Sequence, residues 1–171
     1  MPYEEITIRP IGTVRNRSQK SGRAAGTWSE RVAEMKAQAA ETSEIVIDGI
    51  SEEALKHIED FSHITVVYWA HLTDAMKLEN TVKVHPMGNP EFPEVGVLAS
   101  RSPVRPNPIL ITTVCLRERK GNVLIVTGLD ALDGSPVLDI KPYTPERGAL
   151  KYARIPDWMS RISREYDDAE R

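Results

Sequence analysis

About seven short runs of β-branched and other apolar residues follow one another along the chain, each ended by turn-forming residues. The clearest run spans residues 64–71, where β-branched and aromatic side chains continue without a Gly or Pro. The runs do not alternate regularly with helical segments, which argues against a parallel sheet of βαβ units. The sequence therefore predicts a mostly β protein, an antiparallel barrel or sandwich with a few appended short helices.

The order of these segments can be predicted along one domain covering residues 1–171. Strands are expected at residues 4–14 (interrupted by Pro10 and Gly12), 44–48, 64–71, 81–85, 95–99, 109–117, 123–127 and 137–140, with a hairpin turn at 120–122. Helices are expected at 28–40, where residues 27–30 form a capping-box pattern, at 52–58 after the N-cap Ser51, and after Asp157.

Residues 101–108 read RSPVRPNP, and this stretch is the most unusual in the chain. Its prolines fix φ and push the preceding residues toward extended geometry, so they stiffen the segment. A stiff segment carrying Arg101 and Arg105 is suited to bind a carboxylate or a phosphate. The alternative is a structural one, in which these arginines tie the segment to nearby acidic residues. Asn107 could anchor the backbone or bind an amide or amino group.

A second unusual stretch, residues 128–143, reads GLDALDGSPVLDIKPY. Asp130 and Asp133 lie around an Asp-Gly turn, where a carboxylate can cap its own backbone or bind a ribose diol or an ammonium group. Asp139 and Lys141 could pair across strands. Tyr143 could present its ring to an adenine or to a core neighbour. Our hypothesis is that this stretch and residues 101–108 converge on one ligand site.

Composition excludes several classes of protein. The net charge of −3 argues against a uniformly basic nucleic-acid binder. However, the basic residues cluster at 9–23 and 101–120, which allows a local positive face that could bind phosphates. Scattered, solvated charge remains the alternative. The four histidines lack metal-ligand spacing, so no metal site is predicted. Neither a Gly-x-Ser-x-Gly motif nor a dinucleotide-binding glycine pattern is present.

The expected location of the protein is the cytoplasm. No run of about eighteen apolar residues is present, so no membrane span is expected. The first residues lack the basic and apolar regions of a secretory signal. Cys115 is the only cysteine and lies in an apolar run, as a buried cysteine of a cytoplasmic protein would.

Four motifs together resemble a known family. They are IGTV at 11–14, FSH at 61–63 with the strand that follows to His71, RSPVRPNPI at 101–109, and LDGSPVLDIKPY at 132–143. In this order they resemble the TsaA-like family, which includes the TrmO (YaeB-like) tRNA methyltransferases. The resemblance covers about residues 6–145 and leaves 146–171 as a C-terminal extension. One departure is Leu110, which stands where the family has a glycine.

The resemblance implies a β-barrel homodimer that binds S-adenosyl-L-methionine. It also implies methylation of the N6 nitrogen of threonylcarbamoyladenosine next to the tRNA anticodon. Carried over by position, the implied cofactor-binding residues are His71, Leu72, Arg101, Ile111, Asp130, Ala131, Leu132 and Asp133, with part of the 15–26 loop.

Other roles follow from the chemistry of the implied reaction. Methyl transfer requires in-line positioning of the acceptor and the methyl group. A carbamoyl nitrogen is a poor nucleophile until it loses its proton, so a base or a polarising group is expected, and Asp133 and Lys141 are the hypotheses. The residues expected to bind the substrate are Arg105, Asn107, Arg15, Arg17 and Tyr143. Two alternatives stay open: methylation of a small molecule or another RNA, and a regulatory module that binds the cofactor without transfer.

Overall fold

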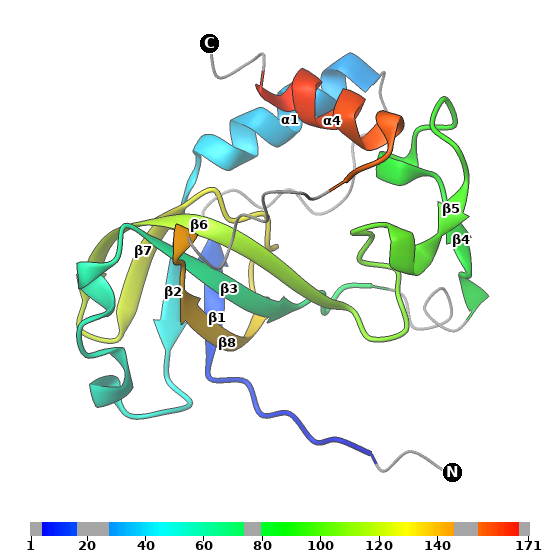
Figure 1. The fold of residues 1–171 in the computed structure, drawn as a ribbon. Helices are drawn as coiled ribbons and strands as arrows, with labels where there is room; N and C mark the ends of the chain where they lie inside the picture. The colour runs from blue at the N-terminus through cyan, green and yellow to red at the C-terminus, as the bar shows by residue number, and fades with distance from the viewer. Residues whose placement is uncertain (1–4, 17–27, 74–79, 146–153, 168–171) are drawn as a thin grey trace.

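The computed structural model describes residues 5–16, 28–73, 80–145 and 154–167 (Figure 1). Its strands are β1 (Gly12–Asn16), β2 (Thr42–Ile47), β3 (His63–Trp69), β4 (Lys83–Val84), β5 (Val95–Gly96), β6 (Ile109–Lys120), β7 (Val123–Thr127) and β8 (Pro136–Pro142). The α-helices are α1 (Trp28–Ala40) and α4 (Asp157–Asp167). Short 3₁₀ turns span Glu52–Leu55, Ile58–Asp60, Pro86–Gly88 and Val97–Ala99.

Six strands form a closed barrel in the order β1-β2-β7-β6-β3-β8, and every pairing between them is antiparallel. The barrel closes where Gly12 of β1 faces Val137 of β8. Closure removes the free strand edges that an open sheet would expose. The prediction of a mostly β, antiparallel barrel with short helices is therefore confirmed.

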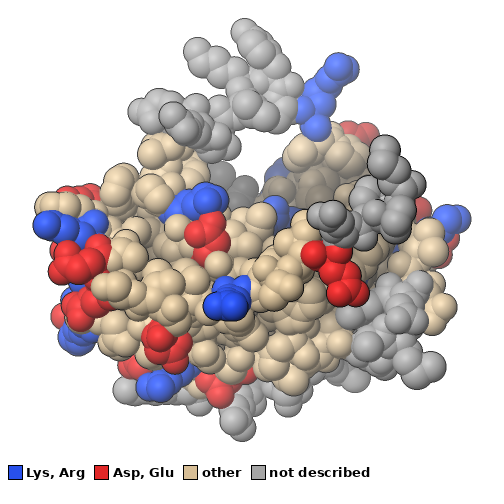
Figure 2. Space-filling view, turned by 90° about the horizontal axis from the view of Figure 1, so that it is seen from below, with Lys and Arg blue, Asp and Glu red and all other residues tan. Residues whose placement is uncertain are grey.

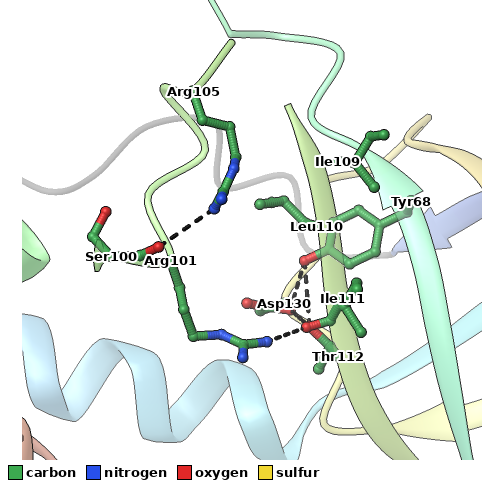
Figure 3. A pocket seen from close by; sticks show the side chains of 9 residues that line it. All are labelled: Tyr68, Ser100, Arg101, Arg105, Ile109, Leu110, Ile111, Thr112 and Asp130. Atoms are coloured by element: carbon green, nitrogen blue, oxygen red, sulfur yellow. Dashed lines mark hydrogen bonds between the residues drawn. The ribbon is translucent and has the colours of Figure 1, made fainter. Parts of the chain in front are cut away.

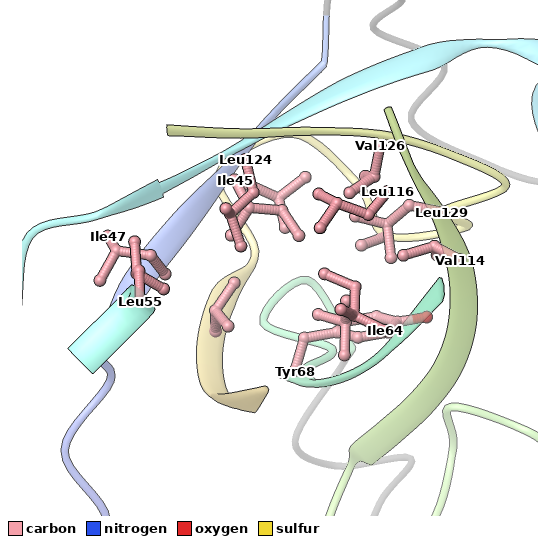
Figure 4. Packing of buried hydrophobic residues seen from close by; sticks show 14 residues of the cluster. Ile45, Ile47, Leu55, Ile64, Tyr68, Val114, Leu116, Leu124, Val126 and Leu129 are labelled. Atoms are coloured by element: carbon pink, nitrogen blue, oxygen red, sulfur yellow. The ribbon is translucent and has the colours of Figure 1, made fainter. Parts of the chain in front are cut away.

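Alternation along the strands fills the barrel interior with aliphatic side chains (Figure 4). In β3 the residues Ile64, Val66 and Tyr68 point inward and are at most 1% exposed. The cluster that they join consists of Val14, Ile45, Ile47, Leu55, Val114, Leu116, Leu124, Val126, Leu129, Ala131 and Val137. Tyr68 is the inward residue nearest the end of β3, so its ring belongs to the core while its hydroxyl reaches the end of the barrel.

Several elements differ from their predicted bounds. The expected strand at 4–14 begins only at Gly12, because residues 5–10 are exposed and Pro10 has no N–H for a ladder. The expected helix at 52–58 is two 3₁₀ turns, because His57 between them has φ 66°. Ser51 does cap the first turn, accepting a hydrogen bond from Glu53 N at 3.3 Å. The expected strand at 95–99 ends at Gly96 and continues as a 3₁₀ turn.

The helices α1 and α4 contact each other and lie together at one end of the barrel (Figure 1). Trp158, Met159 and Ile162 of α4 are half-buried. The guanidinium of Arg161 lies 5.2 Å from the centroid of the buried Phe92 ring, which ties α4 to the segment beside the β4–β5 ribbon. In the part of the chain that is described, no helix is long and apolar enough to span a membrane.

Candidate functional site

A cavity of about 350 Å³ opens at the end of the barrel, beside the proline-rich loop (Figure 3). This volume lies within the range of about 300–1,000 Å³ that is usual for small-molecule sites. The lining comes from Tyr68 of β3, the first residues of β6, the loop at 100–105 and the segment that follows β7. The residues are Tyr68, Ser100, Arg101, Arg105, Ile109, Leu110, Ile111, Thr112 and Asp130.

The proline-rich loop is held by its own backbone and by β6. Ser100 Oγ donates to the Val97 carbonyl at 2.8 Å and accepts from Ser102 N at 3.2 Å. The Arg101 guanidinium donates to the Ile111 carbonyl on β6. Arg105 Nη1 makes a longer contact of 3.4 Å with the Ser100 carbonyl. A guanidinium has five N–H donors, so both arginines keep further donors for a ligand.

Acidic residues do not tie this loop down. Within the described residues, no hydrogen bond or ion pair joins Arg101 or Arg105 to an aspartate. The alternative role of the two arginines, tying the loop to nearby acidic residues, is therefore not seen among the described residues. Both guanidinium groups instead line the cavity, opposite the carboxylate of Asp130.

Asp130 is held by two hydroxyl groups that the sequence analysis did not single out. Its Oδ1 accepts hydrogen bonds from Tyr68 Oη at 2.7 Å and from Thr112 Oγ1 at 2.5 Å. Burial and the neighbouring Asp130 carboxylate raise the pKa of the Tyr68 hydroxyl well above its usual value, so Tyr68 stays protonated and donates. No local pattern in the sequence marked these two hydroxyls, because each lies among ordinary strand residues.

The cavity has a polar part and an apolar part. Two guanidinium groups and one carboxylate give its described lining a net charge of +1, with opposite charges on facing walls. Ile109, Leu110 and Ile111 form the apolar part. Leu110, which replaces the glycine of the TsaA-like pattern, also packs against the barrel core. Such a site suits a ligand that has an anion and a cation close together on an otherwise apolar body.

A second polar cluster lies at the turn before β8. Ser135 Oγ is 3.3 Å from His71 Nδ1, and Gly134 lies beside the same imidazole ring. Asp133 Oδ1 accepts from Asn16 N at 2.9 Å, and Asn16 Nδ2 donates to the Ala131 carbonyl at 2.5 Å. These contacts bring the end of β1 and His71, two residues after β3, to the turn. None of these residues lines the cavity.

The remaining predicted cofactor contacts are divided between the two places. Arg101, Ile111 and Asp130 line the cavity. His71, Ala131 and Asp133 belong to the second cluster, with Leu72 exposed next to His71 and Leu132 next to Asp133. The stretches 101–108 and 128–143 thus meet at the cavity through Arg101, Arg105 and Asp130.

The other residues with predicted roles lie away from the cavity lining. Lys141 Nζ pairs with Asp139 Oδ2 at 2.6 Å, with both side chains partly exposed. Tyr143 meets the ring of His63 edge to face, with centroids 6.4 Å apart. Their roles as catalytic and substrate-binding residues stay predictions.

Three more positions complete the predicted substrate-binding set. Asn107 is exposed, and its carbonyl accepts from Ile109 N at 2.7 Å. Arg15 is exposed on β1, whereas Arg17 lies outside the described residues. These roles also stay predictions.

One face of the molecule is hollowed, and charged side chains of both signs lie around the hollow. Figure 2 shows a face that is hollowed, with Lys or Arg side chains inside the hollow and Lys, Arg, Asp and Glu intermixed around it. On this face the charges do not form a patch of one sign. Among the residues with described positions, no group of three or more His, Cys, Asp or Glu could hold a metal ion.

Comparisons with known proteins agree on one family. The family described as tRNA-methyltransferase O N-terminal domain (TrmO_N) matches residues 30–148. A probable S-adenosyl-L-methionine-binding protein of Methanothermobacter thermautotrophicus is 41% identical over 150 residues, covering 86% of this chain and 97% of that protein. The mouse tRNA (adenine(37)-N6)-methyltransferase is 35% identical over 92 residues, which cover 54% of this chain and 21% of the mouse protein.

A solved structure supports the same assignment. The crystal structure of TrmO from Pseudomonas aeruginosa superimposes with a TM-score of 0.64 at 27% identity, and it covers 88% of this chain. This chain spans 62% of the length of that TrmO. The family match over most of the chain, the 41% identical relative and the structural match therefore lead to one conclusion: the chain belongs to the TrmO family.

Proposed function

We propose that this chain binds S-adenosyl-L-methionine in the cavity and transfers its methyl group to an adenosine of tRNA. The family and the names of the relatives support this assignment. The observation that carries it is that two guanidinium groups and the Asp130 carboxylate line opposite sides of one cavity. The methionine end of the cofactor is a zwitterion, with a carboxylate and an ammonium group on one carbon atom, and it matches that arrangement.

The contacts of the two arginines suggest different roles. The Arg101 side chain is fixed to the Ile111 carbonyl, so its direction is set before a ligand arrives. We assign Arg101 to the cofactor carboxylate and Asp130 to the cofactor ammonium group. Ile109, Leu110 and Ile111 would then lie along the apolar parts of the cofactor.

Charge counting leaves Arg105 for the second substrate. The cofactor carries a sulfonium, an ammonium group and a carboxylate, which sum to +1. The lining also carries +1, so the occupied cavity carries +2. Pairing the cofactor carboxylate with one arginine and its ammonium group with Asp130 leaves two positive groups without an anion, the sulfonium and one guanidinium. We assign Arg105 to an anionic group of the RNA, either a backbone phosphate or a carboxylate on the modified base.

The finer parts of the proposal concern the acceptor and the assembly. We propose that the methyl acceptor is the N6 nitrogen of adenosine 37, as named for the mouse relative, and that this adenosine carries a threonylcarbamoyl group. We also propose that the protein acts as a homodimer in the cytoplasm. Arg15, Arg17, Asn107 and Tyr143 are proposed to contact the RNA. We propose that Asp133 takes up the proton of the acceptor nitrogen, or that Lys141 polarises the acceptor.

A second candidate is a protein that binds the cofactor without transferring the methyl group. The observation that favours it is the name of the relative that matches nearly end to end, which mentions cofactor binding only. In that case the site would act as a sensor of the cofactor.

Two measurements, made one after the other, test these proposals. Isothermal titration calorimetry with S-adenosyl-L-methionine should give a saturable, one-site isotherm, and no heat of binding would refute both candidates. Incubation with methyl-labelled cofactor and tRNA should then place label in the nucleic acid. Two tRNA preparations, with and without the threonylcarbamoyl modification, test the acceptor. Binding without label in either tRNA would favour the sensor.

A further inference from the structure

Asp130 accepts hydrogen bonds from two hydroxyl groups of the barrel, those of Tyr68 and Thr112. Tyr68 comes from β3, Thr112 from β6 and Asp130 from the segment after β7, so three separate segments meet at one oxygen atom. Tyr68 Oη and Thr112 Oγ1 are themselves 3.5 Å apart, and both donate to Asp130 Oδ1. Hydrogen bonds from two fixed donors restrict the rotation of the carboxylate.

The second carboxylate oxygen is left for a ligand. No hydrogen bond or ion pair to Asp130 Oδ2 is recorded among the residues that the structure describes. Figure 3 shows the Asp130 carboxylate between the two hydroxyl groups on one side and the cavity, with Arg101 and Arg105, on the other. Because Oδ1 is taken by the barrel, Oδ2 is the oxygen that can accept from a bound cation.

The barrel does not need these hydroxyls for its packing. Tyr68 is 1% exposed, and Phe in its place would fill the same space without a polar atom. Val has nearly the shape of Thr at residue 112. Polar groups in a core lower stability unless they are paired, and apolar isosteres are often equivalent in stability. The role of these two hydroxyls is therefore to be sought in the cavity, where both contact the Asp130 carboxylate.

We infer that Tyr68 and Thr112 are positioning residues, whose hydroxyl groups hold Asp130 Oδ1 so that Oδ2 faces the cation of the bound ligand. This inference rests on the proposed binding of the cofactor in the cavity. Asp130 lies on an exposed turn, so an unrestrained side chain would lose rotational freedom on binding. The two hydroxyls impose that loss during folding, which preorganises the site.

The test is calorimetry with S-adenosyl-L-methionine on Tyr68→Phe and Thr112→Val. Each substitution should weaken binding about tenfold, as expected for one hydrogen bond to a charged group. Thr112→Ser, which keeps the hydroxyl, should bind like the unmodified protein. Thr113→Val is the matched control, because Thr113 is the next residue of β6 and its Oγ1 lies 3.2 Å from Thr65 Oγ1 in an exposed contact. It should leave affinity unchanged.

A thermodynamic cycle separates positioning from a general effect on the fold. If both hydroxyls act through Asp130, then Tyr68→Phe and Thr112→Val should cause no further loss in an Asp130→Ala background. Equal losses in both backgrounds would overturn the inference, as would native affinity in folded Tyr68→Phe and Thr112→Val. Should Tyr68→Phe fail to fold, the Thr112 series alone decides. Failure of the unmodified protein to bind the cofactor would instead refute the proposed function, and the inference with it.

Discussion

The hydroxyl oxygen of Ser135 lies 3.3 Å from Nδ1 of His71, across the turn that leads into β8. Ser135 is 1% exposed, and among the described residues His71 is the hydrogen-bond partner recorded for its hydroxyl. A buried hydroxyl proton needs an acceptor, so we expect Ser135 to donate to Nδ1 and the imidazole to carry its proton on Nε2. His71 would then offer Nε2–H as a donor.

Replacing Ser135 by Ala should remove the hydrogen bond that favours the Nε2–H tautomer of His71. We expect ¹⁵N chemical shifts to show Nε2–H for His71 in the unmodified protein and a mixture of tautomers in Ser135→Ala. His71→Gln assigns the signal. The matched control is Ser62→Ala, because Ser62 Oγ lies 2.9 Å from His63 Nδ1 in an exposed pair. That change should alter the His63 signal alone. A proton on Nδ1 of His71 in the unmodified protein would contradict the assignment.

Gly12 is required by the closeness of β1 and β2. A Cβ atom at Gly12 would lie 2.3 Å from the Val46 carbonyl oxygen, so the backbone of one strand would have to move. Gly12→Ala should lower the free energy of unfolding by about 2 kcal/mol or more. Gly96→Ala is the control, because nothing lies within 4 Å of its Cβ position. Its effect should stay within about 0.5 kcal/mol. Urea denaturation measures both, and equal effects would refute the steric argument.

Arg119 anchors the two 3₁₀ turns to the barrel. Its side chain is 17% exposed and reaches the Leu55 carbonyl at 3.2 Å, Glu52 at 3.2 Å and Glu59 at 3.3 Å. Arg119→Met should lower the free energy of unfolding by about 1–2 kcal/mol, since it leaves the part-buried Leu55 carbonyl without its donor. The exposed Glu52 and Glu59 carboxylates return to water and add little to this loss. Lys120→Met should cost less than about 0.5 kcal/mol, because Lys120 pairs with Glu118 in an exposed position.

The same cluster predicts a dependence of stability on pH. A hydrogen bond from the backbone N–H of Glu59 to its own carboxylate, together with the nearby Arg119 guanidinium, lowers the pKa of the Glu59 carboxyl from its reference value of 4.5. A carboxyl whose pKa is lower in the folded state stabilises the fold above the unfolded pKa and loses this effect as the pH falls. Stability should therefore decrease below about pH 4.5, and the decrease should be smaller in Arg119→Met. Parallel curves for both proteins would contradict this role.

Much of the fold could be predicted because strands favour β-branched and apolar residues and are separated by turn-forming ones. Runs of such residues located β3, β6, β7 and β8, and the turn at 120–122 located the hairpin between β6 and β7. Bounds failed where backbone conformation decided: nothing in the residue types indicated φ 66° at His57, which divides the expected helix. Ring closure between β1 and β8 also depends on contacts between residues far apart in the chain.

The site could be predicted in part for a similar reason. Arg101 and Arg105 stood out because both lie in a proline-stiffened segment, and Asp130 because it lies near an Asp-Gly turn in the second unusual stretch. Tyr68 and Thr112 did not, because a tyrosine or threonine in an apolar strand has the composition of an ordinary strand residue. Their importance comes from the register of β3 and β6, in which Tyr68 pairs with Leu110, two residues before Thr112. Register between distant strands is not encoded in local pattern.

The two arginines of the cavity should separate cofactor binding from RNA binding. Arg101 is fixed to the Ile111 carbonyl and is assigned to the cofactor carboxylate, so Arg101→Ala should weaken binding of S-adenosyl-L-methionine about tenfold or more. Arg101→Lys should restore little of it, because an ammonium group cannot reach the carbonyl and the carboxylate with the same geometry.

Arg105 provides the contrasting result. Its contact with the Ser100 carbonyl is 3.4 Å long, and charge counting leaves its guanidinium without an anion once the cofactor is bound. Arg105→Ala should therefore leave cofactor affinity within about threefold, weaken tRNA binding and reduce the slope of log affinity against log salt by about one. Calorimetry measures the first quantity, and tRNA titrations at several salt concentrations measure the others. If Arg105→Ala abolished cofactor binding while Arg101→Ala did not, the two assignments would have to be exchanged.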